Sequence, residues 1–174
     1  MAYTKINRYL FFLVVASFFC SVSSAQGVKS PDSTELLIRK IRKEYNRINA
    51  GSSRMKVVKQ DVPDESPESG ELRKFYEKDT LRKAVKTLYF EMGKLVNEYY
   101  FKDGRLFFSY EANMRYDKPM SVEGSKVSKV EQSRFYFNGY NLVRWLDKRG
   151  KIVTDKKLHA AKEKKLLDEA KKFR

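Results

Sequence analysis

The chain has 174 residues, and its 37 basic and 22 acidic side chains give a formal net charge of +15 at pH 7. One cysteine, Cys20, and one histidine, His159, argue against a Cys-based or His-pair metal site and against a Ser/His catalytic triad. A chain this basic is expected to attract polyanions, although lysine-rich helices that simply face water would give the same composition.

The first 25 residues have the pattern of a cleaved export signal. Lys5 and Arg8 form a positively charged start, and an apolar run follows over residues 9–19. Small residues at positions 23–25 then precede a cleavage site before Gln26. The pattern predicts export from the cytoplasm.

Two other interpretations of this segment are weaker. A membrane anchor needs about 20 apolar residues, whereas the run over residues 9–22 is shorter and contains two serines and Cys20. Lipidation of Cys20 is disfavoured because the bulky Phe18 and Phe19, rather than small residues, precede it.

We therefore predict a signal peptide over residues 1–25 and a single domain over residues 26–174, with no membrane span after cleavage. The signal holds two basic residues and no acidic ones, so the mature formal charge is +13. Its removal also takes Cys20, which leaves no thiol for a disulfide or a nucleophile. The absence of disulfides favours the bacterial periplasm, or secretion from bacteria, over secretion from a higher cell.

Two helices are predicted, on either side of a β-rich centre. The first spans residues 32–50, where Asp32 and Glu35 have capping-box spacing and an apolar stripe follows at helical intervals. The second spans residues 155–173, with a weaker apolar side among many lysines. His159 lies in this second helix and is interpreted as a structural or surface residue.

The centre of the chain reads as consecutive β-hairpins over residues 71–154. A short strand is expected over residues 55–62, followed by an acidic, proline-containing loop over residues 61–70. Asp103-Gly104 and Asn138-Gly139 are strong signals for two-residue turns, because both residues of a type I′ turn need positive φ. The predicted fold class is α+β, with an antiparallel meander of about six to seven strands between two helices.

These turns also predict which side chains share a face of the sheet. With regular alternation, Phe101 faces Leu106 and Tyr99 faces Phe108 on an apolar core side. The same reasoning pairs Phe135 with Leu142 on that side. The opposite face then carries a mixed aromatic and basic set, formed by Tyr100, Phe107, Arg115, Arg134, Tyr136, Val143 and Trp145.

Three segments of the meander share a common unit, at residues 89–95, 100–106 and 136–142, and each places Tyr-Phe ahead of a turn and a leucine. This Tyr-Phe-x-x-Gly-[Lys/Arg]-Leu pattern resembles the short hairpin repeats of the MORN type, and the whole arrangement is similar to small secreted bacterial proteins. The units start 11 and 36 residues apart rather than at an even period, and the third has its glycine one place early. The resemblance implies a β-meander used as a scaffold or binding surface, and it supplies no catalytic residue.

The aromatic-basic face is the candidate ligand site, represented by Tyr100, Phe107, Arg115, Arg134, Tyr136 and Trp145. Rings provide flat stacking surfaces, and guanidinium groups form paired hydrogen bonds with phosphate or carboxylate. The alternative is that one of the helices covers this face and turns the rings into a second core layer.

The sequence thus predicts an exported, non-enzymatic binding or scaffold protein without a cofactor or metal. Its partner is expected to be an anionic glycan or lipid of the envelope, or an envelope protein, since export separates the chain from nucleic acid. One alternative is a basic protein that lies on a membrane surface through the C-terminal helix. Another is a small hydrolase that uses the carboxylate pair Glu98 and Glu111.

Overall fold

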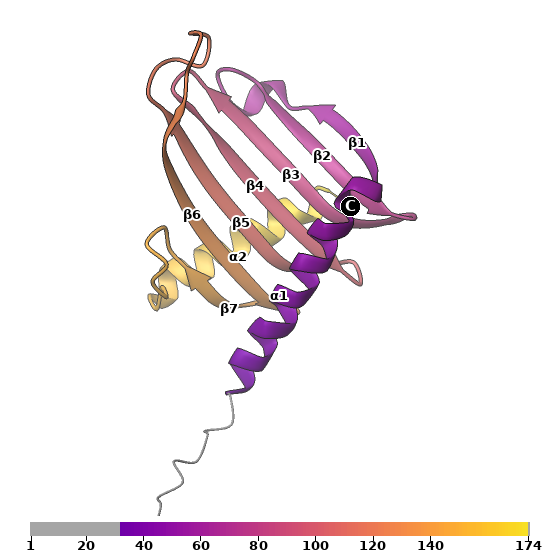
Figure 1. Ribbon diagram of the computed structural model, residues 1–174. Helices are drawn as coiled ribbons and strands as arrows, with labels where there is room; N and C mark the ends of the chain where they lie inside the picture. The colour runs from indigo at the N-terminus through magenta and orange to yellow at the C-terminus, as the bar shows by residue number, and fades with distance from the viewer. Residues whose placement is uncertain (1–31, 174) are drawn as a thin grey trace, which may run out of the picture. The chain divides into compact units, whose positions relative to one another are not determined.

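The computed structural model describes residues 32–173, and the predicted signal peptide lies outside this range. Seven antiparallel strands form one sheet, with helix α1 on one face and helix α2 on the other (Figure 1). We call these the α1 face and the α2 face. The elements in chain order are α1 (Ser33–Gly51), η1 (Ser52–Arg54), β1 (Lys56–Asp61), η2 (Pro63–Glu65), β2 (Gly70–Glu77), β3 (Thr80–Phe90), β4 (Gly93–Lys102), β5 (Arg105–Tyr116), β6 (Val127–Asn138), β7 (Asn141–Leu146) and α2 (Lys156–Lys171).

The predicted fold class is confirmed, and both helices begin and end within two residues of the predicted bounds. Asp32 caps α1 by accepting a hydrogen bond from the backbone N–H of Thr34, at 3.4 Å. Asp155 caps α2 in the same way, with the N–H of Leu158 at 2.9 Å. Within residues 32–173, neither helix combines the length and apolarity that a membrane crossing requires.

The strands follow one another in space in the same order as in the chain, so the sheet is a simple meander. It begins earlier than the predicted range of 71–154, because the short strand expected near Val57 and Val58 is β1 and pairs with β2. Short turns join most neighbouring strands, which suits the many hairpin signals in the sequence.

One of the two predicted turns is confirmed and the other is shifted. Asp103 and Gly104 both have positive φ, 49° and 69°, as a type I′ turn requires. In the second hairpin Asn138 pairs with Asn141, so the turn residues are Gly139 and Tyr140 instead of Asn138 and Gly139. Only Gly139 of these two has positive φ, which fits a type II′ turn.

Each of these two hairpins has a β-bulge close to its turn, and beyond the bulge the residues that face each other differ from the predicted pairs. Phe101 faces Leu106 as expected, but the next pair is Tyr100 with Phe108, which leaves Phe107 as an extra residue. Val143 is the corresponding extra residue in β7. One extra residue reverses the side on which the following side chains of that strand lie. The predicted division into two faces therefore holds for Tyr100, Phe107, Arg134, Tyr136 and Val143, which share the α1 face, and is wrong beyond the bulges in β5 and β7.

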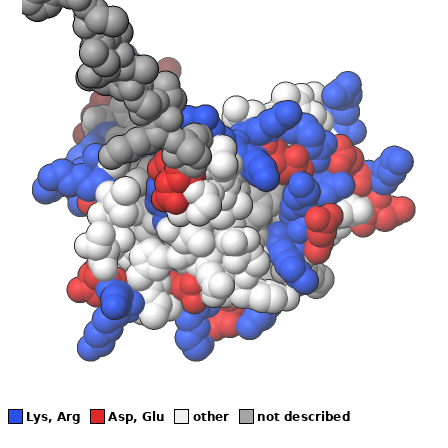
Figure 2. Space-filling model, turned by 90° about the horizontal axis from the view of Figure 1, so that it is seen from below, with Lys and Arg blue, Asp and Glu red and all other residues white. Residues whose placement is uncertain are grey.

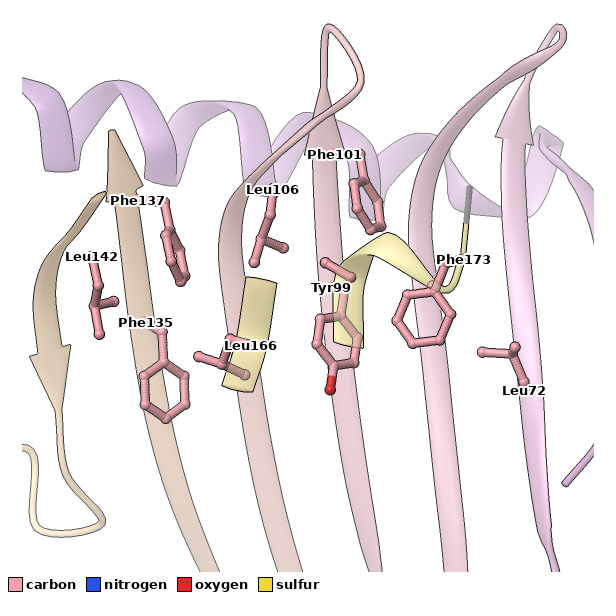
Figure 3. Close-up of a cluster of buried hydrophobic side chains, with 11 residues drawn as sticks. Leu72, Tyr99, Phe101, Leu106, Phe135, Phe137, Leu142, Leu166 and Phe173 are labelled. Atoms are coloured by element: carbon pink, nitrogen blue, oxygen red, sulfur yellow. The ribbon is translucent and has the colours of Figure 1, made fainter. Parts of the chain in front are cut away.

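Both faces of the sheet are apolar cores, each covered by a helix. On the α2 face, Leu166, Ala170 and Phe173 pack against rings and leucines of the sheet (Figure 3). On the α1 face, Ile38, Ile41 and Ile48 pack against Tyr100, Phe108 and Tyr136. The open question of whether a helix covers the aromatic strand face is therefore answered, because α1 does so.

Candidate functional site

A cleft of about 590 Å³ lies between α1 and strands β4, β5 and β6. We call it the α1 cleft. Its lining combines apolar side chains with two arginines, several phenol rings and one carboxylate: Ile41, Arg42, Tyr45, Asn46, Val96, Glu98, Phe108, Tyr110, Ala112, Met114, Arg134 and Tyr136. This mixture of an apolar wall and a few polar groups is typical of ligand sites.

Cross-strand pairing brings the polar groups of the sheet into one row. Glu98 of β4 lies opposite Tyr110 of β5, which lies opposite Arg134 of β6. The helix provides the facing wall, where Arg42 and Tyr45 are three positions apart and therefore neighbours on the helix surface. The bulge in β5 places Tyr110 on the same face as Glu98 and Arg134, and this face is the one that α1 covers.

The carboxylate of Glu98 is already compensated at one end of the cleft. The Lys83 ammonium lies 3.1 Å from it, and the hydroxyl of buried Tyr100 donates a hydrogen bond to it. Asn49 of α1 joins this network, since its Oδ1 accepts from Lys83 at 3.0 Å and lies 3.1 Å from the Tyr100 hydroxyl. Burial, reinforced by the charge of Glu98, raises the pKa of Tyr100 well above its usual range.

Two of the phenols that line the cleft, Tyr45 and Tyr110, remain protonated at neutral pH. Burial raises the pKa of Tyr45, and the nearby Glu98 adds to the effect. Burial also raises the pKa of Tyr110, partly opposed by the positive charge of Arg134. Both hydroxyls can therefore donate hydrogen bonds to a bound group.

The two arginines of the cleft form no ion pair among residues 32–173, although the charge of Arg42 contributes to the lowered pKa of Glu35. The Arg42 guanidinium lies 5.9 Å from the ring centroid of Tyr136. Arg134 is half-buried and donates one hydrogen bond to Gln132 Oε1, at 3.1 Å. With Glu98 paired to Lys83, the cleft keeps an excess of positive charge from groups that bind carboxylate or phosphate well.

Only part of the predicted site lies in this cleft. Arg134 and Tyr136 line it, while Tyr100 is fully buried beneath it. Phe107, displaced by the bulge, packs on the α1 face and lines a separate groove of about 340 Å³ near the Asp103-Gly104 turn.

Trp145 and Arg115 lie on the α2 face, so the expectation of a common surface for all six residues is wrong. Trp145 pairs with Phe135 across the strands, and their ring centroids are 5.5 Å apart. Arg115 is exposed at the far end of β5, next to Gly93 and away from the cleft. The cause is the pair of bulges, which regular alternation does not include.

The predicted carboxylate pair does not form, because Glu98 and Glu111 lie on opposite faces of the sheet. Glu98 pairs across the strands with Tyr110, and Glu111 pairs with Asn97. Glu111 forms an ion pair with Lys162 of α2, at 2.7 Å. Within residues 32–173, no cluster of three or more His, Cys, Asp or Glu side chains is suited to hold a metal.

Arg42, Tyr45 and Tyr110 are the functional candidates that the sequence did not indicate. Tyr45 belonged to the apolar stripe of the first helix, and Arg42 lies beside Ile41 of that stripe. A basic residue at the edge of a core-facing stripe is a signal that could have identified Arg42 once α1 was assigned to a sheet face.

Basic residues are not gathered into one patch on the surface shown in Figure 2. In this view uncharged residues occupy the centre, and lysines and arginines lie around it with acidic residues among them. The net charge alone therefore does not identify a binding surface. Comparison with models of protein families, with curated proteins and with solved structures gave no match.

Proposed function

We propose that the protein is an exported, non-enzymatic binding protein that holds an anionic ligand in the α1 cleft. The observation that supports this most directly is the pair of arginines, Arg42 and Arg134, that line the cleft without an ion pair among the described residues. Arg42 is exposed, whereas Arg134 is half-buried, and a half-buried guanidinium with unused donors is best satisfied by a carboxylate or a phosphate.

The rest of the lining favours a ligand that also has a ring. Tyr45, Tyr110 and Tyr136 present aromatic surface beside the arginines, and two of these phenols can donate hydrogen bonds. An acidic sugar or a phosphorylated sugar of an envelope glycan or lipid has both features. Export to the envelope would bring the protein to such a ligand.

The proposal is tested by salt-dependent retention on immobilised lipopolysaccharide. We expect Arg42→Gln and Arg134→Gln each to weaken binding about tenfold to a hundredfold, since a hydrogen bond to a charged group contributes about 1.5–3 kcal/mol. Arg149→Gln is the control, because this exposed arginine does not line the cleft and its loss changes the net charge equally.

An equal effect of all three substitutions would show that only the overall charge attracts the ligand, and would contradict a site in the cleft. A retention that does not change with salt would contradict a charged ligand altogether.

A further inference from the structure

A second chamber, of about 270 Å³, lies on the other side of the sheet beneath α2. Its floor is a polar row that crosses three strands, in which Lys86 of β3 lies opposite Asn97 of β4 and Asn97 lies opposite Glu111 of β5. A polar row in an otherwise apolar face is unusual, because burying such groups costs free energy unless they are paired.

Most of the charges in this chamber are neutralised in place. Lys86 forms ion pairs with Glu65, at 2.6 Å, and with Glu169 of α2. Lys162 of α2 forms one with Glu111, at 2.7 Å. With Lys165, the lining holds three ammonium groups and three carboxylates, so its formal charge is zero.

Asn97, the uncharged member of the polar row, is not paired in the way that Lys86 and Glu111 are. Its side chain is 8 % exposed and lines the chamber, and its Oδ1 is buried without a hydrogen-bond partner among the described residues. Nearly all buried polar atoms in native proteins have a partner. The oxygen is closed to solvent as it lies, so a molecule in the chamber would bond it after a half-turn of the amide, which exchanges the positions of its oxygen and nitrogen.

Tyr99 places a hydroxyl on the same side. Figure 3 shows its oxygen directed out of the apolar cluster of rings and leucines. Tyr99 lines the chamber, and burial together with the nearby carboxylates of Glu169, Glu111 and Glu65 raises its pKa, so the hydroxyl stays protonated.

We propose that this chamber binds a small uncharged polyhydroxylated molecule of about the size of one sugar ring. Hydroxyl groups both donate and accept, so they match an unpaired carbonyl oxygen, carboxylates and ammonium groups in one site. A lining of zero formal charge does not select a charged ligand. The volume lies just below the range of about 300–1,000 Å³ that is typical of pockets for drug-sized ligands. This inference is independent of the α1 cleft, which lies on the opposite face.

The test is an NMR titration of the isotope-labelled protein with D-glucose, N-acetylglucosamine and myo-inositol, up to about 50 mM, which covers millimolar dissociation constants. We expect at least one probe to shift the Asn97 side-chain amide, and Asn97→Leu to weaken that binding tenfold or more. Without ligand, Asn97→Leu should melt at the same temperature as the wild type or higher, because it removes an unpaired buried carbonyl. Asn113→Leu, at an exposed position of β5, is the matched control and should bind like the wild type.

Tyr99→Phe provides a second variant that keeps the apolar core if Asn97→Leu fails to fold, and it too should bind the probe more weakly. Two results would overturn the proposal: no shift with any probe, or binding that is equal in the wild type and the folded variants. In either case the chamber holds solvent only, and Asn97 is bonded to water.

Discussion

The buried ammonium of Lys86 gives a quantitative test of how α2 is held on the sheet. Its side chain is 6 % exposed and lies between Glu65 and Glu169. Lys86→Met keeps most of the volume of the lysine side chain but removes the ammonium group, so the half-buried carboxylate of Glu169 loses its main ion-pair partner. Removing one member of a buried ion pair costs about 3–5 kcal/mol. We expect the free energy of unfolding to fall by an amount near the lower end of this range. Glu169 keeps its ion pair with Lys172, at 3.2 Å, and water can hydrate the carboxylate of Glu65.

A loss of about 3 kcal/mol corresponds to a fall of about 6–12 °C in melting temperature for a chain of this size. Urea unfolding followed by the fluorescence of Trp145, which packs beneath α2, measures the change directly. The control is Lys164→Met, which breaks a surface ion pair with Asp168, at 2.7 Å, in the same helix. Surface pairs contribute little, so this variant should resemble the wild type.

The effect should also depend on pH. Burial raises the pKa of Glu169, but hydrogen bonds from Lys86 and Lys172 outweigh it and lower the pKa below the ordinary 4.5. A lowered folded-state pKa stabilises the protein above the unfolded pKa, and this contribution is lost as the pH falls through the folded pKa. The difference between the wild type and Lys86→Met should therefore shrink below about pH 4.5. Equal losses for Lys86→Met and Lys164→Met at neutral pH would refute the reasoning.

Two further predictions compare matched pairs of substitutions by urea unfolding. Gly93→Ala places a Cβ 2.2 Å from the carbonyl oxygen of Met114 and should lower the free energy of unfolding by about 1–3 kcal/mol. Gly51→Ala meets nothing closer than 3.7 Å and should raise it by up to about 1 kcal/mol, because alanine favours the helix. A change of the same sign in both variants would contradict this prediction. Leu166→Ala, at a side chain that is 1 % exposed, should cost about 2–5 kcal/mol, and Leu158→Ala, at one that is 56 % exposed, should stay within about 0.5 kcal/mol. Similar losses would mean that α2 is not anchored through Leu166.

The helices, the meander and the Asp103-Gly104 turn could be predicted because each depends on local sequence. Asp32 and Asp155 mark helix starts, and the turn needs only two residues with positive φ. The side of the sheet on which each side chain lies could not be predicted. The alternation of apolar and polar residues along a strand distinguishes two faces only when one face is polar. Here both are covered by helices, so Phe107 and Val143 fit an apolar environment on either side and nothing in the sequence reveals the bulge.

The candidate sites were harder to predict, because their groups meet only through tertiary structure. Arg134 and Tyr136 could be identified from the aromatic-basic pattern, but their partner Arg42 comes from a helix whose position on the sheet is not encoded locally. The chamber beneath α2 was missed altogether. Lys86 and Glu169 are 83 positions apart in the chain, so no spacing rule connects them.

The meander has a consequence for the order of folding. Each strand pairs with its immediate neighbours, so the sheet can grow by one local hairpin at a time, which is the rapid kind of assembly. The contacts of α1 are long-range by comparison, since Glu35 reaches Arg144 over 109 positions. A sheet that has formed before the helices dock exposes two aromatic surfaces and is prone to associate with its copies. The large positive charge of the chain opposes such encounters through mutual repulsion, which gives the lysine-rich composition a role during folding itself.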